Sequence, residues 1–334
     1  MRKRFEMNIW FVFCSLLKNP GGWPDILRGT DMRKENRRMA LSRKQFDVLV
    51  AMKESETTLS QRELEKITDF SLGTINKVIK ELTEEGLIEN GNVTDKGTDA
   101  LEPYRAKRAV FIAAGFGSRM VPITLNTPKP LVRVHGKRII DTLLDACFAA
   151  GIEEIYIVRG YLAEQFDQLL YKYPNIRFLD NPVYNEANNI SSAVLARHLL
   201  SNSYVFEADL LLSNPKIITK YHYTSDFLAI PKDRTDDWCF AVKDGVIKEE
   251  KVGGENCWQM VGISYWNDED GKKLEEDLPS VFNGPGGKER YWEQVPLVYK
   301  KENYKVAVRE CREEDIVEID TFRELKEIDK SYDV

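Results

Sequence analysis

The spacing of hydrophobic residues changes twice along the 334-residue chain and divides it into three parts. The first part, residues 1–38, has a basic start and one apolar run over residues 9–17. That run is far shorter than the ~20 residues that cross a bilayer, and no small-residue cleavage site follows it. We therefore expect residues 1–38 to be a disordered extension rather than a membrane anchor or a secretory signal.

The second part, residues 39–103, has the periodicity of three short helices. Phe46, Leu49 and Val50 stand at the i, i+3, i+4 spacing that gives a helix one apolar face. Ser60 and Glu63 have the spacing of a capping box, which predicts the start of a second helix. A third helical pattern follows and ends at a glycine.

After these helices, Asn90-Gly91 between short apolar runs predicts a tight hairpin turn. Three helices with a small β-ribbon resemble a winged helix-turn-helix of the MarR-like DNA-binding kind. However, residues 40–105 hold nine basic and thirteen acidic residues, a net charge of −4, whereas DNA readers normally present a basic surface. Polar residues between positions 74 and 80 could still enter a groove, so DNA binding and a structural or dimerising role both stay open.

The third part, residues 106–330, alternates short β-rich runs with helical patterns. This alternation predicts an α/β fold, a Rossmann-like domain with a mixed, mostly parallel sheet, preceded by the small winged helix. In such sheets ligands bind beyond the carboxyl ends of the strands. The first candidate site is therefore the segment that follows the strand predicted at residues 109–113.

That segment reads AAGFGSRMVPITLNTPKPL and combines two glycines with two cations. It lacks the third glycine of a dinucleotide-binding fingerprint and the Gly-Lys-Ser/Thr of a Walker A loop. Gly115 and Gly117 would let backbone N–H groups approach phosphates without interference from Cβ atoms. Arg119 offers a planar fork for phosphate oxygens, and Lys129, held between two prolines, offers a point charge.

This pattern resembles the signature of the nucleotidyltransferases that activate sugars and alcohol phosphates. The resemblance implies that the loop holds a nucleoside triphosphate and that Arg119 and Lys129 are catalytic, with Lys129 at the α-phosphate where negative charge builds. It also implies a Mg²⁺ ion held by two aspartates. Asp209, at the end of YVFEAD, and Asp320, at the end of IVEID, match those positions, although each could instead cap the segment that follows it.

Further segments resemble those that line the base and the ribose in this superfamily. One follows the predicted strand at residues 154–158, and another opens a helical pattern near residue 190, where ordinary turn and cap chemistry is the alternative. The nucleotide-binding residues expected from the resemblance are Ala113, Ala114, Gly115, Gly117, Ser118, Gly160, Tyr161, Asn188 and Ser192.

In the second half of residues 106–330, several tryptophans stand next to acidic residues. Trp238 follows two aspartates, and the pair Tyr291-Trp292 precedes Glu293. Aromatic faces and carboxylates together attract a quaternary ammonium, by ~1–2 kcal/mol for each well-placed ring. We therefore expect these four residues to bind choline, with packing in the core as the alternative.

From about residue 108 to residue 326, the chain is similar to the bacterial CTP:phosphocholine cytidylyltransferases. The matching pieces are AAGFGSRM, RGYLAEQFDQL, NNISS, SNSYVFEADLLL, RTDDW, GISYWN, RYWEQ and VEID. The resemblance implies that CTP and phosphocholine give CDP-choline and pyrophosphate. The alternatives are a sugar-1-phosphate or phosphoethanolamine nucleotidyltransferase, or a DNA-binding regulator that uses this domain to sense nucleotides.

Composition adds limits on partners and location. The net charge of −6 gives no reason to expect a membrane surface or nucleic acid as the main partner. Five cysteines without CxxC spacing and three scattered histidines argue against a zinc site or a disulfide framework. We therefore expect a cytoplasmic protein with no membrane partner. The resemblance described above implies CTP and phosphocholine as partners, while DNA through the winged helix and a homodimer stay open.

Overall fold

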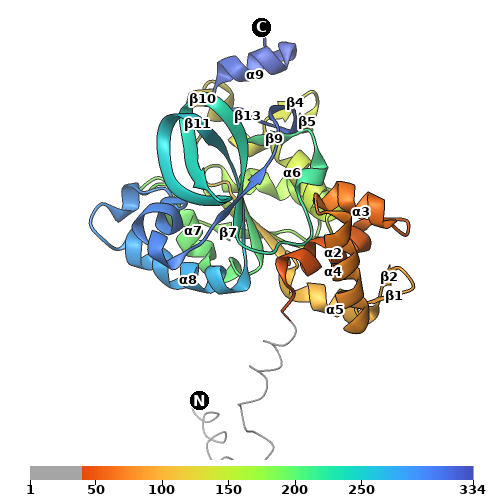
Figure 1. Cartoon of the computed structure of the whole chain (residues 1–334). Coiled ribbons are helices and arrows are strands. Elements are labelled where there is room, and N and C mark those ends of the chain that lie inside the picture. Colours follow the sequence, from red (N-terminus) through yellow and green to blue (C-terminus); the bar gives the residue numbers. More distant parts are fainter. Residues whose placement is uncertain (1–39, 334) are drawn as a thin grey trace, which may run out of the picture. The chain divides into compact units, whose positions relative to one another are not determined.

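A seven-stranded mixed sheet organises the part of the chain that the computed structural model describes, residues 40–333. Its strands lie in the order β10-β12-β11-β8-β3-β6-β7, with helices against both faces (Figure 1). This architecture confirms the predicted α/β fold with a mixed, mostly parallel sheet. The extension expected at residues 1–38 lies outside the described residues.

The parallel half of the sheet is built around β3 (Arg108–Ile112). It pairs in parallel with β6 (Glu154–Arg159) and β8 (Ser203–Glu207), and β7 (Arg177–Asp180) extends the sheet beyond β6. Because these strands run in one direction, their carboxyl ends meet at one edge. The loops that follow β3, β6 and β8 therefore converge there.

Successive residues of β3 supply two different cores. Phe111 belongs to the apolar cluster on the side of α6 (Ile139–Ala149), whereas Val110 belongs to the cluster that includes α7 (Ile190–Ala196) and α8 (Asp268–Phe282). Side chains alternate between the faces of a strand, so a continuous apolar run such as AVFI is buried on both sides. This double burial fixes the sheet between two helical layers.

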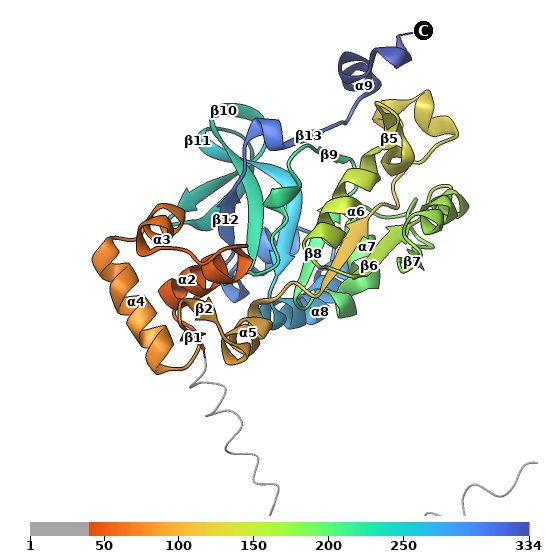
Figure 2. The same cartoon turned by 90° about the vertical axis from the view of Figure 1, so that its right-hand side faces the viewer.

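The antiparallel half is dominated by a long ribbon formed by β10 (Asp226–Lys243) and β11 (Val246–Trp266). β11 also pairs with β8, and β12 (Ala307–Glu310) lies between the two strands of the ribbon in the sheet order (Figure 2). In the outer part of the ribbon, Trp238 pairs with Val252 and Phe240 with Glu250. Because side chains alternate between faces, these four residues lie on one face of the ribbon.

Short strands tie distant segments to the edge of the sheet. β9 (Leu210–Leu212) pairs antiparallel with β13 (Ile316–Glu318), and β4 (Arg133–Val134) pairs with β5 (Lys137–Arg138). The chain then ends in α9 (Phe322–Ile328). The pairing of β9 with β13 places the residue before β9 close to the residues after β13.

The winged-helix region has the predicted helices and ribbon, and one further helix. Its elements are α2 (Arg43–Glu54), α3 (Gln61–Thr68), α4 (Leu72–Glu84), β1 (Ile88–Glu89), β2 (Asn92–Val93) and α5 (Asp95–Leu101). Ser60 and Glu63 form the predicted capping box. Helix α5 was not predicted, because Gly97 in its first turn weakens the helical pattern. A Cβ atom at Gly97 would lie 2.2 Å from the Leu87 carbonyl oxygen, so the close contact there requires glycine.

Residues 98–108, which join the winged helix to the third part of the chain, form ordered structure. It contains the end of α5 and a 3-10 turn at Glu102–Tyr104, and the Tyr104 ring lies 5.0 Å from that of Phe46 and 5.6 Å from that of Tyr223. Residues from Arg43 onward accordingly form one compact unit. Most residues of this segment are polar, so its sequence did not indicate that Tyr104 packs against other aromatic rings.

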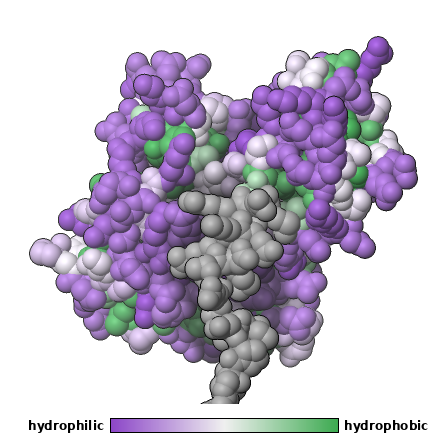
Figure 3. Space-filling model, turned by 60° about the horizontal axis from the view of Figure 1, so that its bottom comes forward, coloured by the Kyte–Doolittle hydropathy of each residue, from purple (hydrophilic) through white to green (hydrophobic). Residues whose placement is uncertain are grey.

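The surface shows no membrane-spanning element in the described part of the chain. None of the helices between residues 40 and 333 is both long enough and apolar enough to cross a bilayer. On the face shown in Figure 3, polar residues predominate and the apolar ones form small separate patches.

Candidate active site

A cavity of 570 Å³ opens at the carboxyl ends of β3 and β8. Most of the residues singled out in the sequence border it, although they come from segments more than 200 positions apart. Those that border it are Ala113, Gly115, Gly117, Ser118, Arg119, Lys129, Asn188, Asp209, Trp238, Tyr291, Glu293 and Asp320.

The glycine loop takes its shape from Gly117. This residue has φ +67°, a left-handed conformation that favours glycine, and its carbonyl oxygen accepts a hydrogen bond from Thr124 Oγ1 at 2.9 Å. A Cβ atom there would lie 3.1 Å from Cβ of Lys129, whereas a Cβ atom at Gly115 would meet open space. The loop is therefore folded tightly against Lys129 and leaves room for a ligand at Gly115.

Two cations and two aspartates that line the cavity form a network of ion pairs. Lys129 Nζ lies 2.8 Å from Asp209 Oδ2 and 2.8 Å from Asp320 Oδ1, and the Arg119 guanidinium contacts both Asp320 oxygens at 2.7 and 2.8 Å. Burial by itself would lower the pKa of Lys129, but attraction to the two carboxylates outweighs it and raises the pKa. Lys129 is therefore charged and shared between the aspartates.

Glu318 joins the same cluster and was missed in the sequence. One carboxylate oxygen from each of Asp209, Glu318 and Asp320 lies within 4.8 Å of the others, and Asp209 Oδ1 is buried without a hydrogen-bond partner. Glu318 is exposed as a residue and lines the cavity. Partial burial of its carboxyl group and the charges of Asp209 and Asp320 raise its pKa to about 8. Such a set of crowded oxygen ligands fits a divalent cation of the Mg²⁺ type.

Four of the expected nucleotide-binding residues support the cavity from behind without bordering it. Tyr161 donates from its backbone N–H to the Ala114 carbonyl at 3.0 Å and from its hydroxyl to the Thr124 carbonyl at 2.8 Å. Gly160 packs under Tyr184, and Ser192 Oγ accepts a hydrogen bond from the Asn181 amide. Ala114, Gly160, Tyr161 and Ser192 thus hold the loops in place.

The aromatic part of the cavity differs from the expectation at Trp292. Trp238 and Tyr291 border the cavity with ring centroids 5.7 Å apart. Trp292 is instead 3% exposed and packs in the core against Phe227 and Trp266. Its place in a choline-binding cage was therefore wrong, because Trp292 fills the apolar layer under α8.

A row of buried carboxylates continues the cavity away from the aspartates. Glu293 is 3% exposed, and Asn189 donates a hydrogen bond to its carboxyl group, but Glu293 Oε2 has no partner. Both carboxylate oxygens of Glu250, whose charge acts on Glu293, are likewise buried without a partner. Burial and the charge of Glu250 raise the pKa of Glu293 to about 8, and burial raises the pKa of Glu250 to about 7.

Glu207 also borders the cavity. Burial, followed by the charges of Glu293 and Asp209, raises the pKa of Glu207 well above its usual range. Neither Glu207 nor Glu250 was expected from the sequence. Glu207 stands at the end of an apolar run, and Glu250 stands in the charged run KEEK, which is typical of a solvated strand.

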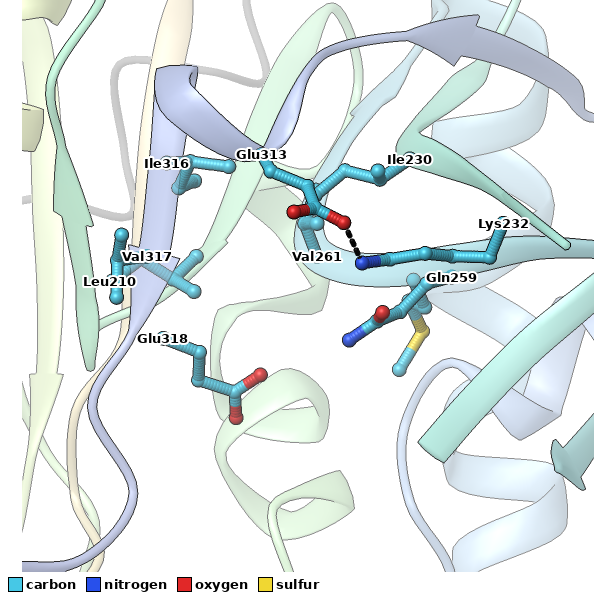
Figure 4. A pocket seen from close by; sticks show the side chains of 10 residues that line it. Leu210, Ile230, Lys232, Gln259, Val261, Glu313, Ile316, Val317 and Glu318 are labelled. Atoms are coloured by element: carbon cyan, nitrogen blue, oxygen red, sulfur yellow. Dashed lines mark hydrogen bonds and ion pairs between the residues drawn. The ribbon is translucent and has the colours of Figure 1, made fainter. Parts of the chain in front are cut away.

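A second, smaller cavity of 270 Å³ adjoins the first (Figure 4). Apolar side chains of Leu210, Ile230 and Ile316 line it, and the ion pair between Lys232 and Glu313 crosses it. Glu318 and Met260 border both cavities. Glu318 is therefore reached from two sides.

Comparisons with known proteins identify two regions of the chain. Residues 108–236 match the Nucleotidyl transferase family, and residues 41–96 match the MarR family. The chain is 34% identical to a 2-aminoethylphosphonate cytidylyltransferase of Lancefieldella rimae over 67% of its own length and 92% of that protein. It is 31% identical to a choline-phosphate cytidylyltransferase of Streptococcus pneumoniae over 67% of its own length and 99% of that protein.

Solved structures agree with the fold. A CTP:phosphocholine cytidylyltransferase from Streptococcus pneumoniae matches with a TM-score of 0.61 and 32% identity, over 67% of this chain and 99% of that one. An inositol-1-phosphate CTP transferase from T. maritima matches with a TM-score of 0.53 at 15% identity, over 67% of this chain and 98% of that one. The second match shows the fold alone.

Replacing Lys129 should expose the competition between this lysine and a metal ion. In Lys129→Met, Asp209 and Asp320 lose their shared cation, so the ligand-free protein should be less stable by about 1–3 kcal/mol. Mg²⁺ should then raise the melting temperature more than it does in wild type, because no ammonium competes for the oxygens. Thermal unfolding across a Mg²⁺ titration measures both effects.

Lys172→Met is the matched control, since Lys172 pairs with Asp145 at the surface. An equal response to Mg²⁺ in Lys129→Met and wild type would contradict this account of the cluster.

The buried Glu250 should make stability depend on pH. Its folded pKa of about 7 lies above the ordinary value of 4.5, so the folded protein holds a proton that the unfolded chain releases. The bound proton therefore stabilises the folded wild type at low pH, and this stabilisation is lost as pH rises from about 4.5 to 7. Between these pH values, the free energy of unfolding of Glu250→Gln should rise relative to that of wild type by about 1–3 kcal/mol. Urea unfolding at pH 5, 6, 7 and 8 tests this, with the exposed Glu249→Gln as a control that should show no such gain.

Proposed function

Because this chain belongs to the nucleotidyl transferase family, we propose that it is a cytidylyltransferase that joins the CMP part of CTP to a small phosphate- or phosphonate-bearing acceptor with a cationic head group. The observation that carries this proposal is the cluster of Lys129, Arg119, Asp209 and Asp320 beside the glycine loop. A surface turn with unpaired cations would not hold two cations and two aspartates from segments about 200 residues apart. Cytosine is supported by the names of the related cytidylyltransferases.

The proposed reaction is an in-line displacement at the α-phosphorus of CTP. An ionised acceptor oxygen forms the new P–O bond, the bond to the β-phosphate breaks, and pyrophosphate leaves. The attacking oxygen is already charged, so no protein base is required. The protein contributes positioning and charge neutralisation.

Each part of the cavity has a proposed task. Backbone N–H groups from Gly115 to Ser118 would hold the triphosphate, Arg119 would bind its outer phosphates, and Lys129 would neutralise charge at the α-phosphate. Asp209, Glu318 and Asp320 would hold Mg²⁺, which when bound supplies positive charge to the triphosphate. Lys129 pairs with Asp209 and Asp320, and Arg119 pairs with Asp320, so both cations would exchange partners as phosphates arrive.

Two acceptors fit the proposed reaction. Phosphocholine, the acceptor expected from the sequence, is supported by the aromatic pair Trp238 and Tyr291 and by the choline-phosphate relatives. 2-Aminoethylphosphonate is supported by the buried carboxylates and by the relative from Lancefieldella rimae. Both carry a cation at one end and a phosphorus oxyanion at the other.

DNA binding by the winged helix remains a separate proposal. Helix α4 carries Lys77 and Lys80, but Glu81 and Glu84 lie one turn further on at 3.8 and 3.7 Å from them. These pairs weaken the positive charge that phosphates would meet. Sub-micromolar, salt-sensitive binding to a defined DNA site without any turnover would favour a nucleotide-sensing regulator over an enzyme.

A cytoplasmic location is proposed as well. Cys147, Cys239, Cys257 and Cys311 are free and buried, which is typical of proteins kept in a reducing compartment.

Turnover should depend on the cation and carboxylate cluster. We expect pyrophosphate release with CTP and one of the two acceptors, and weaker release with the other nucleoside triphosphates or with sugar phosphates. Lys129→Ala and Asp209→Ala should each lower kcat by about 10³-fold or more, while circular dichroism shows an intact fold. Lys172→Ala is the control and should retain wild-type turnover. If either Lys129→Ala or Asp209→Ala still released pyrophosphate at the wild-type rate, the proposed cytidylyltransferase function would be contradicted.

A further inference from the structure

The acidic end of the cavity carries more negative charge than the chain itself neutralises. Glu207 and Glu293 border the cavity, and Glu250, which does not border it, is the charged residue that acts most strongly on Glu293. Between residues 40 and 333, no ion pair joins any of these three carboxylates to a lysine or arginine within 4.0 Å. Glu293 Oε2 and both Glu250 oxygens are also buried without a hydrogen-bond partner. Buried acceptors left in this state destabilise a fold, so their retention points to a ligand that supplies donors.

The geometry points to a primary ammonium as the cationic end of the acceptor, bound between Glu293 and Glu207, with Glu250 as a positioning residue that acts through Glu293. This inference rests on the proposed cytidylyltransferase function. A primary ammonium brings three N–H donors, so it can neutralise Glu293 and Glu207 and also donate a hydrogen bond to the unpartnered Glu293 Oε2. A trimethylammonium has no N–H donor and leaves that oxygen without a hydrogen bond.

The aromatic wall supports the same choice. Trp238 and Tyr291 are the two aromatic residues, among the described residues, that border the cavity, because Trp292 is withdrawn into the core. A quaternary ammonium is best held by ring faces on several sides. The carboxylates of Glu207 and Glu293 border the same cavity, and carboxylates suit hydrogen-bond donors better than methyl groups.

Glu250 is placed to act through Glu293. It lies on the same face of the β10–β11 ribbon as Trp238, and its charge is the main electrostatic influence of the protein on Glu293. A second buried carboxylate near the first increases the attraction for a cation that reaches Glu293. Glu250 should therefore affect acceptor binding without touching the reacting phosphorus.

The test compares acceptors that differ only in N-methylation. Purified full-length protein with CTP and Mg²⁺ is given 2-aminoethylphosphonate or its N,N,N-trimethyl analogue, and phosphoethanolamine or phosphocholine. We expect kcat/KM to favour the primary ammonium of each pair by at least about 100-fold. Equal use of both members, or preference for the trimethyl form, would overturn the inference but leave the proposed function in place. No pyrophosphate release with any acceptor would instead refute the proposed function.

Variants locate the selectivity within the cavity. Glu293→Gln should lower the preference to below about 10-fold, and Glu250→Gln should raise KM for the primary ammonium by about 10-fold with little change in kcat. Glu249→Gln, next in the strand and exposed, should leave both constants and the preference unchanged. An unchanged preference in Glu293→Gln would show that the ammonium binds elsewhere, and an effect of Glu250→Gln on kcat alone would contradict its positioning role.

Discussion

The charge balance around Lys129 is the constraint on which the rest of the site depends. One ammonium group is shared by Asp209 and Asp320, and the Arg119 guanidinium clamps the second of these aspartates. Removing any member leaves an uncompensated charge in a partly buried place, which is costly. The four residues therefore hold three separate segments of the chain together before any ligand arrives.

The fold brings these segments together through strand pairing rather than through local sequence. Asp209 follows β8 directly, and Asp320 follows β13, which pairs with β9. This pairing turns two positions 111 residues apart into neighbours at the carboxyl edge of the sheet. The glycine loop reaches the same edge because β3 runs parallel to β8. The site is thus a consequence of sheet topology, as in other open α/β folds.

The two ends of the cavity differ in how far their carboxylates are neutralised by cations of the chain. At one end, cations of the chain neutralise the aspartates, so arriving phosphates and Mg²⁺ can exchange partners with them. At the other end, Glu250 and Glu293 form no ion pair with a lysine or arginine among the described residues, and burial raises the pKa of both. An acceptor with an oxyanion at one end and a cation at the other matches both ends of the cavity.

The sequence by itself determined the α/β class, the winged helix, the glycine loop, and the choice of Arg119, Lys129 and two strand-end aspartates as candidate site residues. These features rest on local signals: alternation of apolar runs, capping residues, and glycine and proline spacing. Only the tertiary structure decided that Trp292 belongs to the core, that Arg119 and Lys129 pair with the aspartates, that Glu207 and Glu318 border the cavity, and that the buried Glu250 acts on Glu293. The physical reason is that burial and charge neutralisation depend on neighbours from distant strands. A glutamate in KEEK looks solvated until the fold buries it where its charge acts on Glu293.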